Sequence, residues 1–376
     1  DGNEYTSPKG IYEKLSRVDD ETYTLTDPNQ FVQTFKRGKK SNTFYIASYK
    51  DEYQNQIDFT RNEEDQLITV SEAKGIEKQE KIHLEYSNGK ISKVKFADHW
   101  TTYSYNGDLL VQTQIGSDKT TKTITESFAY DDNGQLTKYT DGKNNQTVFS
   151  YKENELTIFD QQAEDEELSI TNTYQFNDKE NEFKSIATDD SETVYKRDKE
   201  KGTYAITQVT EPSETNNSTT FYDLDSHYNI VKVTNPDGTT IENTYDSKGN
   251  VLTSTSTEGT VKNRYNEKNQ LEETVAANGE ITSNTYSGPS LIASTVNDET
   301  TKYEYDSFGR VTKTTYPNGT FDTTTYDDDQ YTVSSTDKEG NNSKIAYTIY
   351  GQQKEVTDAE GHTTEYTYHP LYQDTL

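Results

Sequence analysis

The residues that could bind a metal ion or carry out catalysis are acidic side chains at turns. One acidic turn is "YDDNGQL", which begins at Tyr130, and another is "TYDDDQY", which contains Asp327, Asp328 and Asp329. Clustered carboxylates are ligands that Ca²⁺ prefers, but the twelve-residue loop with a terminal Glu is absent. Asp also stabilises turns by accepting hydrogen bonds from its own backbone. We interpret these residues as turn residues and keep a Ca²⁺ site as the alternative.

The histidines are scattered along the chain and form no recognisable ligand motif. They are His83, His99, His227, His362 and His369, with no His-Glu-x-x-His pattern and no partner at ligand spacing. The sequence also lacks the Gly-x-Ser-x-Gly elbow, the Walker motif and Gly-x-Gly-x-x-Gly. We therefore predict that the chain is not an enzyme and has no catalytic residue, no cofactor and no metal site.

The composition argues against a conventional hydrophobic core. Only 28% of the 376 residues are hydrophobic even when tyrosine is included, and the net charge is −29. These values are also typical of disorder. However, 30 Tyr and 13 Phe with only 7 Pro suit β-strands and are unusual in disordered chains. We therefore expect an ordered protein with an unusually thin core.

Charge and hydropathy exclude several classes of partner. Nucleic-acid binding requires clustered Lys and Arg, and the acidic balance of this chain disfavours it. No apolar run approaches the length of a membrane helix, so this segment is not expected to insert into a membrane. The absence of Cys excludes disulfides and fits bacterial export. The chain begins at Asp1 without a signal sequence, so we expect it to be a piece of a longer protein.

A repeat of about 20 residues organises the chain. Tyrosines that precede turns recur with spacings of 19 to 21 residues, at Tyr245, Tyr265, Tyr286, Tyr305, Tyr326, Tyr347 and Tyr368. Each unit holds two turn signals, such as "YDSKGN" and "NPDGTT", in which Asp-Gly or Asn-Gly supplies a positive φ. One unit is therefore predicted to be two strands. The register loosens towards the N-terminus.

The pattern between the turns predicts a single-layer sheet. In "TKYEYD" the side chains of Tyr303 and Tyr305 share one face, while Lys302 and Glu304 share the other. Segments such as "VTKTTY" place Thr on both faces, whereas a two-sheet sandwich needs apolar residues on one face of every strand. Because strand twist accumulates, an antiparallel sheet of roughly thirty strands is expected to wind. We predict an all-β fold, a long antiparallel strand spiral forming a curved single-layer shell.

These units resemble a known family. The Tyr-Asp-x-x-Gly turn followed by "VTKTTYPNGT", "VLTSTSTEGT" or "EVTDAEGHTTEYTY" resembles the RHS/YD-repeat family of bacterial polymorphic toxins, toxin-complex shell proteins, Gram-positive wall-associated proteins and animal teneurins. The resemblance covers residues 105–376 as a repeat region that ends within a repeat. Residues 1–104 are predicted to be degenerate N-terminal repeats with a lead-in. The absence of Cys and the Lys, Asn, Asp and Glu content are most like a Gram-positive wall-associated or secreted member.

The resemblance implies a structural role. Many members of the family form a hollow β-strand shell around a C-terminal toxin that an autoproteolytic core releases. The Asp-Pro-x-Gly elements of that core do not occur in this sequence. The resemblance implies a shell segment of a secreted or cell-wall-associated bacterial toxin, acting between bacteria by contact-dependent inhibition or after secretion. Its partners would be the rest of the parent shell and the C-terminal toxin domain.

Two further expectations concern the surface. The alternative function is a cell-surface adhesion module whose tyrosines stack on carbohydrate, with cell-wall glycans as partners. Against it, Tyr recurs at one fixed position per unit, as a packing residue would. The acidic charge suggests the hypothesis that an acidic inner face attracts a basic effector such as a nuclease. The competing interpretation is that the charge keeps a large exported protein soluble.

Overall fold

The protein is an all-β chain in a computed structural model that describes residues 5, 7–8, 11–74, 77–153, 155–161, 169–177, 179–197, 206–212 and 217–368. Over these residues the structure contains 33 strands and no helix. The predicted all-β fold class is therefore confirmed. A helix that could cross a membrane is likewise not found in this part of the chain.

The strands are short and evenly distributed along the chain. They are β1 (Lys14–Asp19), β2 (Thr22–Thr26), β3 (Val32–Arg37), β4 (Phe44–Lys50), β5 (Gln56–Arg61), β6 (Leu67–Lys74), β7 (Glu77–Ser87), β8 (Lys90–Phe96), β9 (His99–Asn106), β10 (Leu109–Ser117), β11 (Ile124–Tyr130), β12 (Leu136–Thr140), β13 (Gln146–Lys152), β14 (Glu155–Gln161), β15 (Ile170–Asn177), β16 (Glu182–Ile186), β17 (Glu192–Arg197), β18 (Ile206–Glu211), β19 (Ser218–Leu224), β20 (Ile230–Thr234), β21 (Thr240–Tyr245), β22 (Val251–Ser256), β23 (Gly259–Tyr265), β24 (Leu271–Val275), β25 (Ile281–Ser287), β26 (Ser290–Val296), β27 (Glu299–Tyr305), β28 (Val311–Thr315), β29 (Phe321–Asp327), β30 (Thr332–Thr336), β31 (Asn342–Tyr347), β32 (Gln353–Thr357) and β33 (Thr363–Glu365).

Each strand pairs antiparallel with the next one in sequence, so the 33 strands form one continuous sheet. The predicted two strands per unit are present: β27 and β28, for example, form one unit of the C-terminal region. β9 runs across residue 104 without interrupting the sheet. The division of the chain at residues 104 and 105 concerns repeat regularity and stays a prediction.

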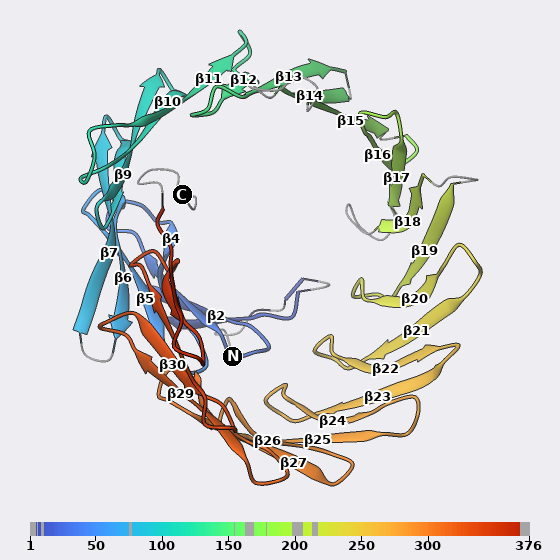
Figure 1. The fold of residues 1–376 in the computed structure, drawn as a ribbon. Coiled ribbons are helices and arrows are strands. Elements are labelled where there is room, and N and C mark those ends of the chain that lie inside the picture. The colour runs from blue at the N-terminus through green and yellow to red at the C-terminus, as the bar shows by residue number, and fades with distance from the viewer. Residues whose placement is uncertain are drawn as a thin grey trace.

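The sheet winds into a ring around an open middle (Figure 1). The late strands, from β19 to β33, come back beside the early strands, from the segment before β1 to β9, and the two sets are joined by contacts at their turns. The turn after β27 meets the turn after β4, and the turn after β31 meets the turn after β8, so the partner lies 23 strands further along in both cases. This confirms the predicted curved, single-layer spiral.

One type of turn closes half of the hairpins. In sixteen described turns the first residue donates its N–H to the carbonyl of the fifth, and the fourth donates to the carbonyl of the first. The fourth residue has a positive φ in all of them. In the turn at 246–250, Asp246 Oδ1 also accepts the N–H groups of Lys248 at 2.8 Å and Asn250 at 2.9 Å. These turns begin at residues 27, 51, 62, 131, 141, 187, 225, 235, 246, 266, 276, 306, 316, 337, 348 and 358.

The positive φ expected of turn glycines is found at Gly309, with φ of 81°, and at Gly319, with φ of 84°. A Cβ at Gly319 would meet no atom within 4 Å, so only its backbone conformation resists a larger residue. Replacing Gly319 by alanine is expected to lower the free energy of unfolding by about 1 kcal/mol in urea titrations. Gly319→Asn should cost less, because Asn144 and Asn269 occupy the same turn position. Equal stability of all three proteins would contradict the expectation.

Turn length and strand length both vary along the chain. Asn88 and Gly89 both have positive φ, of 50° and 78°, and join β7 to β8 as a two-residue turn. Such turns need fewer residues than the five-residue form. Strand lengths vary as well, from five residues in β2 to eleven in β7. The spacing between equivalent tyrosines therefore changes although the strand pairing continues.

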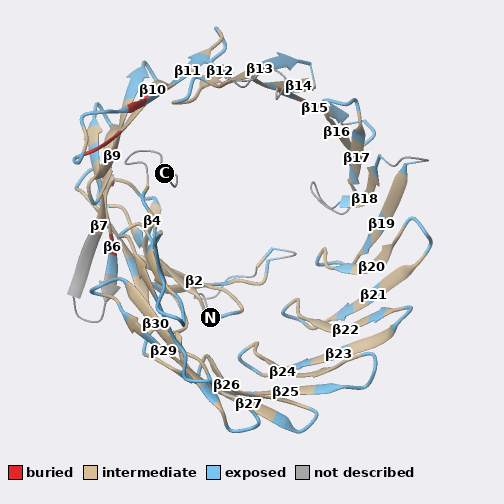
Figure 2. Cartoon of the chain, viewed as in Figure 1, coloured by how far each residue is buried: buried red, intermediate tan, exposed pale blue. Residues whose placement is uncertain are grey.

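The wall has almost no buried core. Among the described residues, Ile124 is the buried apolar side chain, and the buried polar ones are Asp65, Ser71, Thr113 and Ser117. Most strand residues are half-buried or exposed (Figure 2). In β27 the half-buried Tyr303 and Tyr305 alternate with exposed Lys302 and Glu304, as predicted. The wall therefore depends on strand hydrogen bonds and cross-strand pairs, such as Thr295 with Thr300 at 2.9 Å.

Candidate functional site

Five of the seven tyrosines that mark the C-terminal repeats tie neighbouring hairpins together. The hydroxyl of Tyr305 donates to the carbonyl of Leu291 at 2.8 Å, and that of Tyr326 donates to the carbonyl of Val311 at 3.1 Å. The same bond is made by Tyr86, Tyr130, Tyr245, Tyr286 and Tyr368. Each hydroxyl therefore satisfies a backbone carbonyl of the preceding hairpin. This arrangement fits the packing role expected from the fixed spacing of the tyrosines.

The acidic turns are occupied by turn hydrogen bonds and ion pairs. Asp131 Oδ1 accepts the N–H groups of Asn133 and Gln135, both at 2.9 Å. Asp328 binds the guanidinium of Arg310, with Oδ1 to Nη1 at 2.6 Å and Oδ2 to Nη2 at 3.2 Å. An open depression of about 560 Å³ lies beside residues 327–329. The contacts support the interpretation of these residues as structural, and Ca²⁺ binding stays untested.

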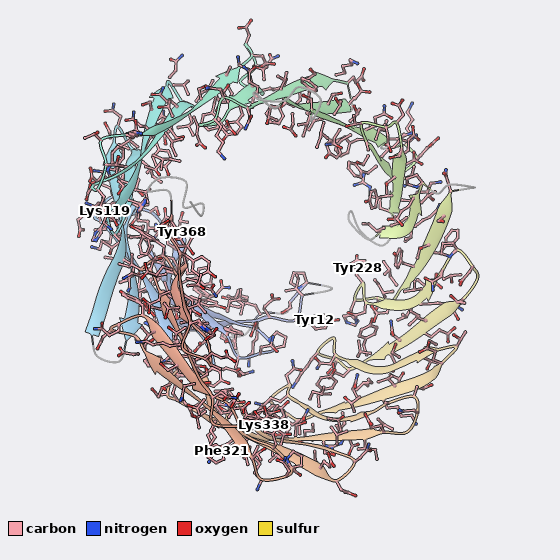
Figure 3. The ribbon with its side chains drawn as sticks, in the orientation of Figure 1. Tyr12, Lys119, Tyr228, Phe321, Lys338 and Tyr368 are labelled. Carbon is pink, nitrogen blue, oxygen red and sulfur yellow. The ribbon has the colours of Figure 1, made fainter. Side chains whose placement is uncertain are left out.

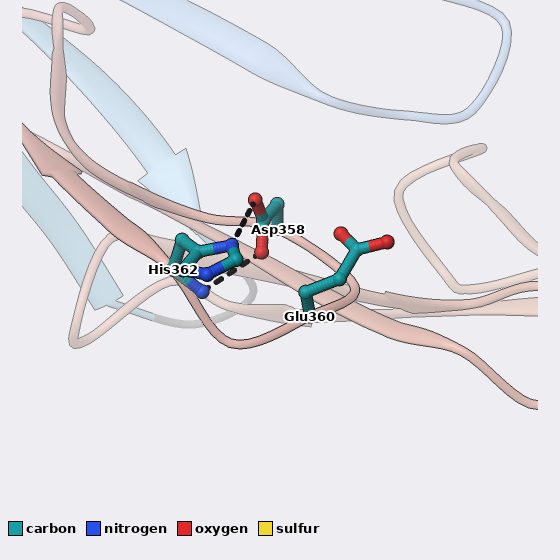
Figure 4. A group of neighbouring side chains, drawn as sticks. All are labelled: Asp358, Glu360 and His362. Atoms are coloured by element: carbon teal, nitrogen blue, oxygen red, sulfur yellow. Dashed lines mark hydrogen bonds and ion pairs between the residues drawn. The ribbon is translucent and has the colours of Figure 1, made fainter.

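One of the scattered histidines, His362, lies in a turn with two acidic side chains. Asp358, Glu360 and His362 place one ligand atom each within 4.8 Å of one another (Figure 4). All three side chains are exposed. Asp358 already accepts the N–H of His362 at 2.8 Å and contacts its Nδ1 at 3.2 Å. The turn geometry therefore accounts for the cluster, and the predicted absence of a metal site stays a prediction.

The other histidines are dispersed. His83 lies in β7, and His227 lies in the turn after β19, 3.4 Å from the hydroxyl of Ser226. His369 lies outside the described residues. The charged stretch at 160–172 is described only at its ends, where β14 finishes and β15 begins. His99 is the exception, because it takes part in the contact between the late and early strands described next.

That contact, which we call the seam, joins two opposite edges of the sheet. In a meander, turns after odd-numbered strands lie at one edge and turns after even-numbered strands at the other. The early strands contribute the segment before β1 and the turns after β4 and β8. The late strands contribute the turns after β19, β21, β27 and β31. The edge with the turns after odd-numbered strands therefore lies against the edge with the turns after even-numbered strands, as in a spiral.

The first seam contact involves Tyr12. Its hydroxyl donates to Asn229 Oδ1 at 2.9 Å, across 217 residues of sequence. Figure 3 shows Tyr12 reaching towards the turn that carries Tyr228. The ring of Tyr12 also covers Gly249, where a Cβ would lie 2.7 Å from the ring atoms. Only a residue without a side chain allows this approach.

The second contact repeats the same arrangement. Asn55 Nδ2 donates to the carbonyl of Phe308 at 3.2 Å, and the ring of Tyr53 covers Gly309, where a Cβ would lie 2.6 Å from it. The ring of Phe308 packs under the guanidinium of Arg310, whose carbon lies 5.0 Å from the ring centroid. A tyrosine of the early strands thus lies on a turn glycine of the late strands for the second time.

The third contact centres on Asp98. Its carboxylate accepts hydrogen bonds from the hydroxyl of Tyr350 and, at 2.9 Å, from Ser117 Oγ, and it pairs with Lys119 Nζ at 3.2 Å. Tyr350 also hydrogen-bonds His99, and the two rings meet edge to face with centroids 4.6 Å apart. Asp98 and His99 are both largely buried, with 18% and 19% of their side chains exposed.

The seam network keeps ordinary protonation states at neutral pH. Burial would raise the pKa of Asp98, but the hydrogen bonds from Tyr350, Ser117 and Lys119 outweigh it and lower that pKa. Burial and the hydrogen bond to Asp98 raise the pKa of Tyr350. Asp98 is therefore a carboxylate and Tyr350 a phenol. Their hydrogen bond therefore joins a carboxylate of the early strands to a phenol of the late strands.

An open depression of about 520 Å³ lies at this end of the seam. Asp98, His99 and Lys119 line it from the early strands, and Tyr350 and Tyr368 line it from the late strands. Figure 3 shows Lys119 and Tyr368 on this side of the ring. Elsewhere in the sheet, the carboxylate of Glu126 accepts hydrogen bonds from the hydroxyl of Tyr139 at 2.8 Å and from that of Thr113 at 2.6 Å. Burial and the hydrogen bond to Glu126 raise the pKa of Tyr139 to about 12.

Comparison with known proteins supports the repeat assignment. A sequence-family model described as RHS Repeat matches residues 291–320, which cover β26 to β28 and the turns around them. The chain therefore contains an RHS repeat, and the resemblance seen in the YD units is confirmed. A search of curated proteins gives no match.

Several solved structures align with nearly the whole chain at low TM-scores and low sequence identity. A Tc holotoxin pore of Photorhabdus luminescens aligns with a TM-score of 0.39 and 11% identity, covering 96% of this chain and 24% of that one. TcdB2-TccC3 without its hypervariable C-terminal region gives 0.38 and 12%, covering 96% and 24%. The complex TcdB2-TccC3-Cdc42 gives 0.37 and 12%, covering 97% and 22%. This chain spans about a quarter of the length of those chains.

Proposed function

We propose that this chain is a wall segment of a shell that encloses a C-terminal toxin effector of its parent protein. The observation that carries the proposal is the seam: a single-layer sheet winds through 23 strands and then locks onto itself through matched turns. A wall that closes in this way surrounds a space. The RHS repeat at residues 291–320 supports the same role.

The proposed role is structural and not enzymatic. The polar clusters at Asp98, Glu126 and Asp328 are engaged in hydrogen bonds or ion pairs that hold the wall. The partners would be the rest of the parent shell and the effector. We further propose a secreted or wall-associated bacterial protein, from a Gram-positive cell, that acts on neighbouring bacteria.

Protease protection in the parent protein tests the enclosure. The effector domain should resist digestion in the intact parent and become sensitive when the seam is opened by Tyr12→Ser, Tyr53→Ser and Tyr350→Ser together. The isolated effector domain provides the reference rate of digestion. An effector that is digested equally fast in the intact parent and in isolation would show that the wall does not enclose it.

Exposed aromatic side chains support the alternative, a carbohydrate-binding adhesion module. Phe176, Phe221 and Phe321 are 50%, 49% and 49% exposed, and such rings can stack on sugars. Binding to purified cell walls that is lost on replacing all three by alanine would favour adhesion. Wall binding that does not change in this variant would remove the alternative.

The acidic charge predicts salt-dependent attraction of a basic effector. With a net charge of −29, this chain should bind a basic nuclease domain at low salt and release it as the ionic strength rises. Titration by light scattering or calorimetry measures the effect. Binding that is unchanged at about 1 M salt, where the screening length is about 3 Å, would show that charge is not the cause. No binding at low salt would favour the interpretation that the charge serves solubility.

A further inference from the structure

The seam differs in kind from the rest of the wall. Within the wall, neighbouring strands are joined by continuous backbone pairing, with up to eight residue pairs between β9 and β10. Across the seam, the contacts between described residues come from side chains at a few turns: Tyr12 with Asn229, Asn55 with the Phe308 carbonyl, and Asp98 with Tyr350. The seam is therefore the line of fewest contacts in the wall.

Three tyrosines supply most of these contacts. Tyr12 and Tyr53 lie on Gly249 and Gly309, two turn residues of the late strands that have φ of 84° and 81°. Tyr350 acts in the opposite direction, from a late turn to Asp98 in the early strands. In the observed register, each ring lies opposite a glycine that leaves room for it or a carboxylate that binds its hydroxyl.

The residue at the tip of a turn, its third position, also distinguishes several seam turns from the others. Among the sixteen five-residue turns, Tyr or Phe occupies the third position at Tyr53, Phe308 and Tyr350, and all three of these turns are seam turns. Turns at other places have polar residues there, such as Asn278, Asn318 and Glu339. Three seam turns therefore carry a large ring at their tip, whereas the seam turns after β19 and β21 carry His227 and Lys248 there and contact the ring of Tyr12 instead.

We propose that Tyr12, Tyr53 and Tyr350 form a tyrosine latch, which sets the register between the early and late strands. Without the latch the two rows of turns can slide or part, while the backbone pairing within the sheet stays intact. The wall would then open along the seam rather than by strand separation. This inference concerns the wall itself and holds whatever the wall encloses.

Spin labels test the latch directly, because the chain has no native Cys. Glu52→Cys and Ser307→Cys place labels at the second positions of two turns that face each other across the seam. Glu267→Cys and Ser307→Cys place a control pair on two turns of the late strands. Electron spin resonance then gives the distance distribution of each pair, with Tyr12→Ser, Tyr53→Ser and Tyr350→Ser combined as the latch variant.

In the latch variant the seam pair should move apart or broaden by about 10 Å or more, the width of one hairpin. The control pair and the far-ultraviolet β signal should not change. Tyr151→Ser, which removes a 40% exposed tyrosine in β13, outside the early and late strands, should leave both pairs unchanged. A seam pair that keeps its distance in the latch variant would overturn the proposal. Broadening of both pairs would also overturn it, because the tyrosines would then stabilise the arrangement of the hairpins within the wall and not the register across the seam.

Discussion

Replacing Asp98 by alanine is expected to lower the free energy of unfolding by about 3 kcal/mol. The substitution removes the acceptor of Ser117 Oγ, whose residue is only 2% exposed, and the acceptor of the Tyr350 hydroxyl. A buried polar group left without its partner costs about 1–3 kcal/mol. Lys119 adds little, because its side chain is 72% exposed and water solvates it. Urea unfolding followed by the fluorescence of Trp100, the single tryptophan, measures the change.

Asp118→Ala is the matched control. Asp118 follows the strand beside Asp98 and pairs with Lys95 at 2.6 Å, but its side chain is 52% exposed. An exposed ion pair contributes about 0–1 kcal/mol, so this variant should be nearly as stable as the parent chain. Equal losses in the two variants would mean that Asp98 matters for its charge and not for the seam contacts.

The same carboxylate predicts a pH dependence. The pKa of Asp98 is lower in the folded chain than the value of about 3.9 in an unfolded chain. Its contribution is therefore present in full above about pH 4 and is lost as the pH falls towards the folded pKa. The stability difference between the parent chain and Asp98→Asn should be largest near pH 7 and shrink below about pH 4. A difference that is constant from pH 7 to pH 3 would contradict this assignment.

The repeating part of the fold could be predicted from local sequence because its causes are local. Turn residues such as Asp306 and Gly309 fix the hairpin by their own backbone bonds and φ, and alternation along β27 fixes the faces. A uniform hairpin then repeats into a meander. The length of the turn could not be predicted as easily. Gly319 is the fourth residue of a five-residue turn and not part of a two-residue turn.

The seam could not be predicted in the same way. It pairs residues 217 to 256 positions apart, and the pairing depends on the accumulated twist and curvature of some twenty strands. The local sequence around Asp98 and His99 does not indicate that these residues will contact Tyr350. The sequence did contain one signal, the aromatic residues Tyr53 and Tyr350 at turn tips that are polar elsewhere. Their role becomes clear only when the path of the sheet is known.

Gly309→Ala is expected to cost clearly more than Gly319→Ala, about 2–3 kcal/mol against about 1 kcal/mol. Both glycines occupy the fourth position of the same turn type, with φ of 81° and 84°, so the backbone cost is shared. A Cβ at Gly309 would additionally lie 2.6 Å from the ring of Tyr53, whereas one at Gly319 would meet nothing within 4 Å. The ring of Tyr53 must then leave its place, which forfeits an aromatic contact of about 0.5–1.5 kcal/mol and loosens the second seam contact.

A double-mutant cycle separates the backbone cost from the seam cost. Tyr53→Ala removes the ring, so Gly309→Ala in that background should cost only as much as Gly319→Ala does in the parent chain. The two residues should thus show a coupling of about 1–2 kcal/mol, because the alanine methyl and the ring compete for one space. Gly319 and Tyr53 share no contact, so the same cycle at Gly319 should give a coupling near zero. Additive effects at Gly309 would mean that the ring does not rest on this turn in solution. Since Tyr12 lies on Gly249 in the same way, coupling at Gly309 would establish the contact type on which the register of the whole seam depends.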